Sequence, residues 1–294
     1  MVDTSILELT PAEVNGIFSE VRKQSVVQRL ARQVPLAPGG TKTVVWTGKP
    51  VAGFVGEGDE KPVSDPTATT KTMTPEKLAV IVPVSAELVR ASQGNGLLED
   101  LQAQMVEAIA VAFDQAVLYG TDSPFAASLA DTSYEVELDT DGVGVYKSLN
   151  GVLRTLSVAG KKLTGWALDT VVEADLNEAG PNGVSSIFVD SAAEPNTVFR
   201  SGRLLGRPAF LGEGLGAEDG SVLGFGGDFS QIVWGQVSNI NIDVTDQATI
   251  TLNDNSTLNL WQRNMLALRA EVEYGVLIND VNAFVKITPN VAAS

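Results

Sequence analysis

The chain has 294 residues, carries a formal net charge of −16 and contains neither cysteine nor histidine. The lack of cysteine excludes disulfides and thiol nucleophiles, and the lack of histidine excludes a Ser-His-Asp triad and histidine-based zinc sites. With 36 acidic and 20 basic residues, the chain lacks the excess of Lys and Arg that a surface needs to bind the phosphate backbone of nucleic acid. A hydrophobic content of 44% indicates a folded protein of one large or two smaller domains, and the apolar runs are too short to span a membrane.

The first 35 residues carry signals of short amphipathic helices. Thr10 and Glu13 form a capping box, which predicts that a helix starts there. The apolar residues of the segment 26–30 predict a second short helix before Pro35. Because these pieces lie outside any obvious core, they are either peripheral packing helices or an arm that docks on a neighbouring molecule.

The segment 41–82 is unusual. It has β-branched runs at Val44–Thr47 and Leu78–Val82, separated by about thirty residues rich in Gly, Pro and Thr, which is long for a plain connection. The pattern predicts two antiparallel strands that project as a long hairpin, and such a ribbon is marginal alone, so it implies a partner surface. Glu57, Asp59 and Glu60 lack the spacing of a calcium loop and are interpreted as a solvated or partner-facing acidic tip.

A long amphipathic helix is predicted from Leu97 to Gly120. Apolar residues recur every fourth position without an internal Gly or Pro, Asn95 can cap the start, and Gly120 suits the stop. The helix would be about 35 Å long. A shorter helix capped by Ser85 precedes it. We expect the apolar stripe to pack on the closing strands at Leu266, Leu268 and Val272, with Glu99, Glu107 and Asp114 facing outward.

The rest of the chain alternates between helix and strand signals and ends in strands. The order predicts an α+β protein whose first and last thirds must meet. The expected elements are a loop over 121–142, a helix at Val145–Val158, a strand at Thr164–Leu168, a helix at Thr170–Ala179, a strand at Ile187–Val189, a short helix or turn at Thr197–Leu205, strands at Ala209–Leu211 and Ser221–Phe225, two strands within 230–251, and two long strands within 265–287 turned near Asn279 and Asp280.

Few patterns suggest chemistry. The Gly-rich stretches 211–216 and 224–228 fit neither a dinucleotide-binding fingerprint nor a P-loop and are interpreted as turns. The paired carboxylates Asp243 with Asp246, and Glu271 with Glu273, are the only acid/base candidates that remain, and such pairs are expected by chance among 36 acids. We therefore expect no enzyme and no cofactor, with a carboxylate-dependent hydrolase as the alternative from another class.

Three stretches, taken in order, resemble the tailed-phage major capsid proteins of the Hong Kong 97-type fold. VIVPVSAELVRAS followed by LLEDLQAQMVEAIAVAFDQAVLYGTDSP is similar to the family's strand, short helix and spine helix. LLGRPAFLGEGLG and VLGFGGDFSQIVWGQVSNINIDV resemble its "GRP…fGDf" segment, and RNMLALRAEVEYGVLINDVNAFVKI resembles its closing strand pair. Together the stretches cover nearly the whole chain.

The resemblance implies a division of the chain. Residues 1–43 would be an N-terminal arm, 44–82 an extended β-hairpin loop lying across a neighbouring subunit, 83–139 with 256–294 the peripheral domain containing the spine helix 97–119, and 140–255 the axial domain. The loop residues expected to contact the neighbour are Trp46, Phe54, Glu57, Asp59 and Lys61.

The resemblance also implies a function. Hexamers and pentamers would close into an icosahedral phage head, built in the host bacterial cytoplasm, around double-stranded DNA that is not bound sequence-specifically. A portal and a decoration protein would be partners. The arm follows Met1 almost directly, which favours a separate scaffolding protein or none. An encapsulin-type cellular compartment is the alternative within the same fold.

Some family members crosslink a loop lysine to a neighbour's asparagine with the help of a glutamate. Here Lys49, Lys61 and Lys71 lie in the loop, and Asn279, Asn282 and Glu273 lie in the closing strands. No motif assigns three of them to one site, so crosslinking is a hypothesis.

Overall fold

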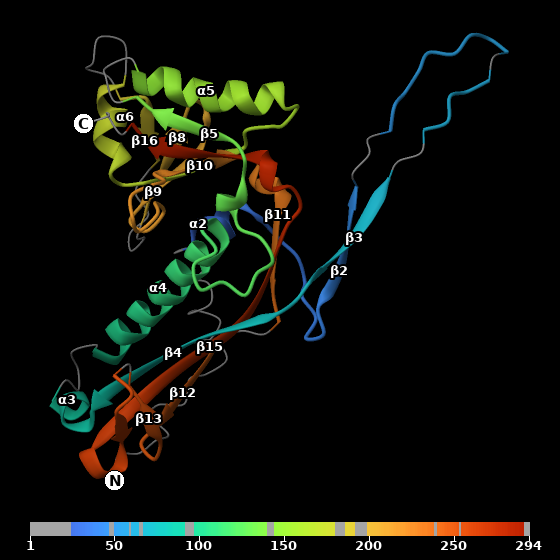
Figure 1. Cartoon of the computed structure of the whole chain (residues 1–294). Helices are drawn as coiled ribbons and strands as arrows, with labels where there is room; N and C mark the ends of the chain where they lie inside the picture. The colour runs from blue at the N-terminus through green and yellow to red at the C-terminus, as the bar shows by residue number, and fades with distance from the viewer. Residues whose placement is uncertain are drawn as a thin grey trace.

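Figure 1 shows a computed structural model of the chain, with a body built on two sheets and a ribbon that projects from it. The structure describes residues 25–46, 50–58, 60–64, 67–91, 97–139, 144–179, 186–191, 199–237, 240–252 and 254–290. The helix predicted to start at Thr10 and the cap predicted at Asn95 lie outside these residues.

The first large sheet is organised around the long strand β15 (Met265–Ile278). It has five strands: β15 is joined by β4 (Glu76–Ser85), β11 (Ile232–Gln236) and β12 (Asn241–Thr245), all antiparallel to it, and β1 (Arg32–Gln33) lies parallel to β11. Strand β4 pairs with β15 over ten consecutive residues, from Met265 opposite Ser85 to Tyr274 opposite Glu76. The first third and the last third of the chain therefore meet in this sheet, as the sequence predicted.

The second large sheet has seven strands in the order β5-β16-β10-β6-β9-β8-β7. Helices α5 (Gly144–Val158) and α6 (Val172–Glu178) bury their apolar sides in one cluster with residues of this sheet. The strands are β5 (Glu135–Leu138), β6 (Gly165–Asp169), β7 (Phe188–Asp190), β8 (Phe199–Leu204), β9 (Arg207–Gly212), β10 (Gly224–Gly227) and β16 (Phe284–Pro289).

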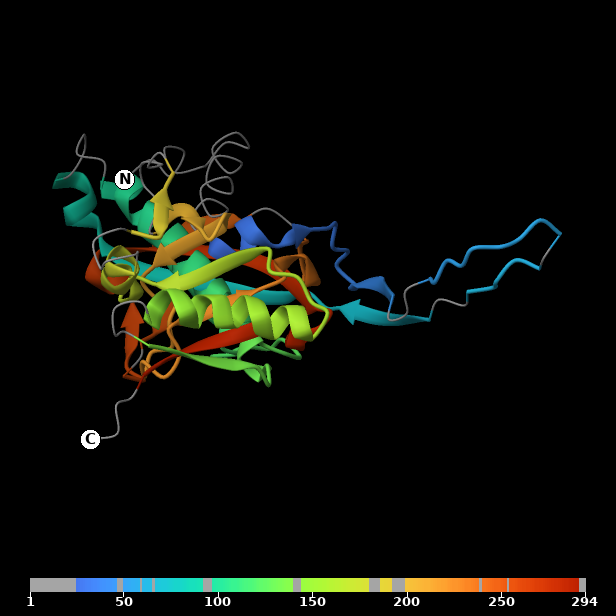
Figure 2. The same cartoon turned by 90° about the horizontal axis from the view of Figure 1, so that it is seen from above.

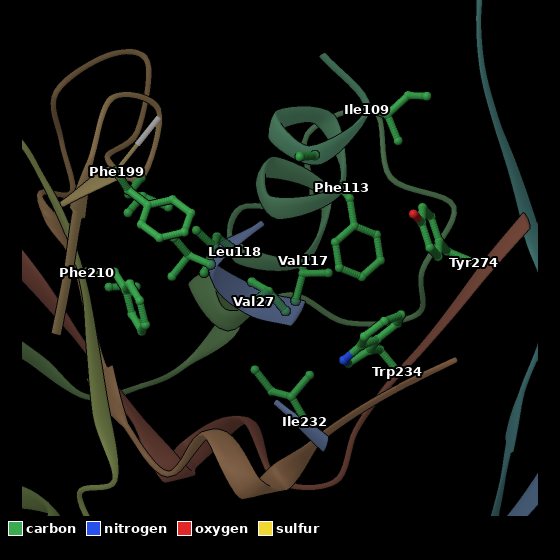
Figure 3. Packing of buried hydrophobic residues seen from close by; sticks show 14 of the residues in the cluster. Val27, Ile109, Phe113, Val117, Leu118, Phe199, Phe210, Ile232, Trp234 and Tyr274 are labelled. Atoms are coloured by element: carbon green, nitrogen blue, oxygen red, sulfur yellow. The ribbon is translucent and has the colours of Figure 1, made fainter. Parts of the chain in front are cut away.

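Helix α4 (Leu97–Leu118) is the long helix that the sequence predicted, and its apolar side lies in the larger buried cluster. Phe113 is at its centre, with its ring centroid 4.8 Å from that of Tyr274 and 6.3 Å from that of Trp234 (Figure 3). The cluster also contains Leu268 and Val272 of β15, as expected, whereas Leu266 is buried without belonging to it. The short helix α2 (Val26–Leu30) packs against α4.

The remaining elements are small. Strands β2 (Thr41–Trp46) and β3 (Ala68–Met73) pair as the base of the predicted hairpin, and α3 (Ala86–Ala91) follows Ser85 as predicted. The others are the pair β13 (Thr249–Thr251) and β14 (Thr257–Asn259) and the 3-10 turns η2 (Leu129–Asp131), η3 (Phe229–Gln231), η4 (Trp261–Arg263) and η5 (Val281–Ala283).

Several expectations were wrong. The segment 197–205, expected as a short helix or turn, contains strand β8, because Phe199, Gly202 and Leu204 are buried while polar residues separate them. The expected loop over 121–142 contains β5, the segment 230–251 contains a third strand, β13, and β10 begins three residues later than predicted. The two closing strands do not pair with each other, since β15 lies in the five-stranded sheet and β16 in the seven-stranded sheet.

The expectation that Asp114 faces outward was also wrong. Its side chain is buried, with 4% of its surface exposed. Glu107, on the same helix, is exposed as expected, and the side chain of Glu99 lies outside the described residues.

Candidate assembly surfaces

The hairpin of β2 and β3 leaves the body and extends well beyond it, as two views at right angles show (Figures 1 and 2). The ladder runs from Thr41 opposite Met73 to Trp46 opposite Ala68. Beyond the ladder the two limbs continue to a turn at Glu57 and Gly58, and the Val51 N–H donates to Ser64 Oγ across them at 2.9 Å. The prediction of a projecting hairpin is confirmed.

The tip of this hairpin displays apolar side chains to solvent. Phe54 is fully exposed, Val63 is 96% exposed and Val51 is 76% exposed. Glu57 and Lys61, predicted contact residues like Phe54, are exposed as well. The side chain of Trp46 and the whole of Asp59 lie outside the described residues. Grouped exposed hydrophobic residues on a folded protein mark an interaction surface.

An apolar groove of about 490 Å³ lies on the body beside α4. Its walls are small residues of the outer side of α4, the start of β4, and the loop that follows α4. Phe113 and Tyr274, from the core, reach its floor. The wall residues are Glu76, Lys77, Leu78, Ala108, Val111, Ala112, Gln115, Ala116, Thr121, Asp122, Pro124, Phe125 and Glu218.

The chain enters the described structure at Ser25, where a buried carboxylate of α4 holds it. Asp114 accepts three hydrogen bonds, from Ser25 Oγ at 2.6 Å, from the Val26 N–H at 2.7 Å and from the Val27 N–H at 3.2 Å. Ser25 Oγ in turn accepts from the Gln28 N–H at 3.1 Å as the N-cap of α2. The chain leading from the N-terminal segment into the body is thus fixed on α4.

Burial raises the pKa of Asp114 to about 7, and the hydrogen bonds from Ser25, Val26 and Val27 oppose that shift only in part. Sequence reasoning missed this contact. Asp114 follows Phe113 at the edge of the apolar stripe, and nothing in the helix pattern shows that Ser25, 89 positions earlier, supplies its partner.

One carboxylate of each pair considered for catalysis, Asp243 and Glu271, belongs to ion pairs on an exposed sheet face. Asp243 accepts from Arg269 at 2.6 Å, and Glu271 lies 2.7 Å from Lys77 and 3.3 Å from Arg269. The hydrogen bond from Lys77 lowers the pKa of Glu271, whereas a general acid needs a raised pKa. These groups stabilise strand neighbours and do not form an acid/base site.

Of the residues considered for a crosslink, Lys71 and Asn279 come together within one subunit, through a hydrogen bond from Lys71 Nζ to the Asn279 backbone carbonyl at 2.8 Å. Lys71 donates to backbone carbonyls at the end of β15, Asn282 Oδ1 accepts from Ser133, and Glu273 is half-buried. Lys49 lies outside the described residues. Crosslinking between subunits stays a prediction.

The described residues include no group of three or more acidic side chains placed to hold a metal ion. Among their helices there is none long and apolar enough to cross a membrane.

Comparison with known proteins identifies relatives of this chain. A sequence profile of the phage capsid family matches residues 9–288. The chain is 42% identical over 292 residues to the "Probable major capsid protein gp17" of Mycobacterium phage L5, covering 95% of this chain and 89% of the relative. It is 27% identical over 280 residues to the "Major capsid protein" of Staphylococcus phage 80alpha, covering 93% of this chain and 82% of that one.

Solved structures show the same fold at low sequence identity. A chain titled "Gordonia phage Cozz" is similar with a TM-score of 0.69 and 23% identity, covering 91% of this chain and 87% of the other. One titled "Mycobacterium phage Adephagia" is similar with a TM-score of 0.67 and 22% identity, covering 100% and 95%.

Proposed function

The chain belongs to the phage capsid family, and we propose that it is a major capsid protein whose copies assemble as hexamers and pentamers into the icosahedral head of a tailed phage. Double-stranded DNA would be packaged inside, a portal and a scaffolding protein would be partners in assembly, and a decoration protein could cover the outside. The net charge of −16 supports a wall that repels the DNA rather than binding it.

The projecting hairpin is the observation that carries this proposal. A two-stranded ribbon with exposed Phe54, Val51 and Val63 at its tip has no core of its own, and its direction takes it away from the body (Figure 1). A second copy is the partner that a protein made in many identical copies always has available. The hairpin tip of one subunit would then lie on the body of the next.

The groove beside α4 is the surface of the described structure best suited to receive that tip. It is apolar, it is open, and it lies next to the start of β4, which continues from the base of the hairpin. Its lining includes Lys77, which pairs with Glu271, and the acids Glu76, Asp122 and Glu218, which would meet Lys61 of an incoming tip.

The sheets support a division into domains. We propose that the five-stranded sheet with α4 forms the peripheral domain and that the seven-stranded sheet with α5 and α6 forms the axial domain. The boundaries differ from those expected from the sequence, since β16 pairs within the seven-stranded sheet while β11 and β12 pair with β15. The arm would extend through residue 43 and the extended loop through residue 82, so most of β4 would belong to the loop and would join it to the five-stranded sheet.

The proposal is tested by expressing the full chain and measuring particle formation by electron microscopy and light scattering. Phe54→Ser is expected to raise the concentration needed for assembly by about tenfold or more, because a buried aromatic anchor contributes about 2 kcal/mol to an interface. Phe54→Leu is the matched control and should assemble nearly as well as the wild type.

Both variants should unfold at the wild-type temperature, because Phe54 is fully exposed in its own subunit. A wild-type chain that stays monomeric with every partner supplied would contradict the shell proposal. Particles that enclose a cargo enzyme and no DNA would favour the encapsulin alternative.

A further inference from the structure

The base of the hairpin differs from the rest of the ribbon, because it is fixed to the body. Along β3 only Met73 is fully buried, and Lys71, two residues before it and on the same face of the strand, is half-buried. The other residues of β3 are exposed. The ribbon therefore meets the five-stranded sheet through one side of its last few residues.

Two glycines make room for this contact. Gly235 of β11 and Gly275 of β15 are paired directly opposite each other. A methyl group on Gly275 would lie 2.8 Å from Met73 Cγ and 2.8 Å from Leu36 Cδ2, and one on Gly235 would lie 2.9 Å from Leu36 Cβ and 3.1 Å from Met73 Cε. The three distances below 3.0 Å are too short for a real side chain, and the contact with Met73 Cε is tight. The glycine pair thus forms a recess that holds Leu36, just before the first limb, and Met73, at the end of the second.

Lys71 adds a polar contact on the same side. Its Nζ donates to the carbonyl of Ile278 at 3.2 Å and to that of Asn279 at 2.8 Å, where β15 ends. Lys71 forms no ion pair within the part of the chain that the structure describes, so these two carbonyls are the partners of its charge. A charged donor to a carbonyl is stronger than a neutral hydrogen bond.

We propose that Lys71 is a positioning residue which, with Met73 in the glycine recess, fixes the direction in which the hairpin projects and hence where its tip meets a second copy. The inference rests on the proposed shell function, which it deepens. Because the ribbon is long, a small change of angle at its base moves its tip by a large distance. Fourteen residues separate Lys71 from Glu57, which corresponds to a reach of at most about 45 Å, so a rotation of roughly 10° at the base moves the tip by about 8 Å.

The first experiment measures direction without requiring assembly. The chain has no cysteine, so spin labels at Glu57→Cys on the tip and Lys162→Cys on the body are unique. Their distance distribution is measured in full-length subunits below the concentration at which they assemble. Lys71→Met keeps a side chain of similar length but removes the charged donor. It should therefore broaden or displace the distribution of distances between the two spin labels. The matched control Lys42→Met, which removes an exposed lysine from β2 of the same ribbon, should leave it unchanged.

The second experiment measures assembly and melting temperature. Lys71→Met should melt at most a few degrees below the wild type, yet need about tenfold more protein to form particles, since the tip is no longer preorganised. Lys71→Arg, which keeps the charge and donors, should restore most of the yield, and Lys42→Met should assemble normally. An unchanged spin-label distribution in Lys71→Met, or unchanged particle yield and diameter, would overturn the proposal. A wild type that forms no shells would refute the shell function instead, and the spin-label distances would then decide alone whether Lys71 sets the direction.

Discussion

Apolar side chains have different roles in two regions of the subunit, the core around α4 and the tip of the hairpin. Around α4, Phe113 packs against Trp234 and Tyr274, and each of the three has 2% or less of its surface exposed. At the hairpin tip, Phe54 is fully exposed. Both regions contain aromatic residues, but only those around α4 are buried within a single subunit. Burial of Phe113 stabilises the subunit, whereas the exposed Phe54 is available for assembly, so mutations at the two positions can distinguish folding from assembly.

The strongest test of that separation is Phe113→Ala. Removing a buried aromatic side chain should lower the free energy of unfolding by about 3–5 kcal/mol, because the transfer free energy is lost and a cavity remains among the neighbouring rings. Urea unfolding followed by tryptophan fluorescence measures the loss. Assembly should fail because the subunit unfolds, and the groove that Phe113 lines should change as well. Ala112→Ser, on the exposed side of the same helix, is the control and should change stability by less than about 0.5 kcal/mol.

A smaller effect is expected from the buried carboxylate that holds the chain at Ser25. The pKa of Asp114 is raised to about 7 in the folded subunit and returns to its ordinary value of 3.8 on unfolding. Between these values the folded state binds the proton more tightly, so this residue's contribution favours folding at low pH and weakens as the pH rises towards 7.

Comparing wild type with Asp114→Asn by urea unfolding at about pH 5.5 and pH 7.5 isolates that contribution from the other acids. The wild type should lose on the order of 2 kcal/mol more than the variant between the two conditions. Equal losses in the two proteins would show that the hydrogen bonds from Ser25, Val26 and Val27 hold Asp114 ionised throughout. In either case the substitution lies in the core on α4 and leaves the residues of the hairpin tip unchanged.

Local patterns explain how much of this fold the sequence predicts. Helices α4 and α5 and the hairpin follow from periodicity, caps and turn residues that lie close together in the chain. Strand β8 was missed because its sequence, FRSGRL, mixes charged and small residues and is a strand only through pairing with β7 and β9. The assignment of β16 to the second sheet depends on partners as distant as Glu135, which no local pattern reveals.

The candidate surfaces divide in the same way. The exposed positions of Phe54, Glu57 and Lys61 follow from their place in a hairpin tip. The contact of Asp114 with Ser25 and the recess formed by Gly235 and Gly275 required the tertiary structure, because each joins segments that are far apart in sequence. Glycine in a strand signals a close approach of other atoms, but not which atoms approach.

The smallest expected effect concerns the exposed ion pairs, which belong to neither region. Arg269 contacts Asp243 and Glu271 on β12 and β15, with about half of its side chain exposed. Solvent screens such pairs, so Arg269→Met should barely shift the midpoint of urea unfolding and should leave the concentration needed for assembly unchanged. A double-mutant cycle with Asp243→Asn measures the coupling directly. A loss of assembly without a loss of stability would place this sheet face in a subunit interface, and residues used for assembly would then extend from the hairpin onto the body.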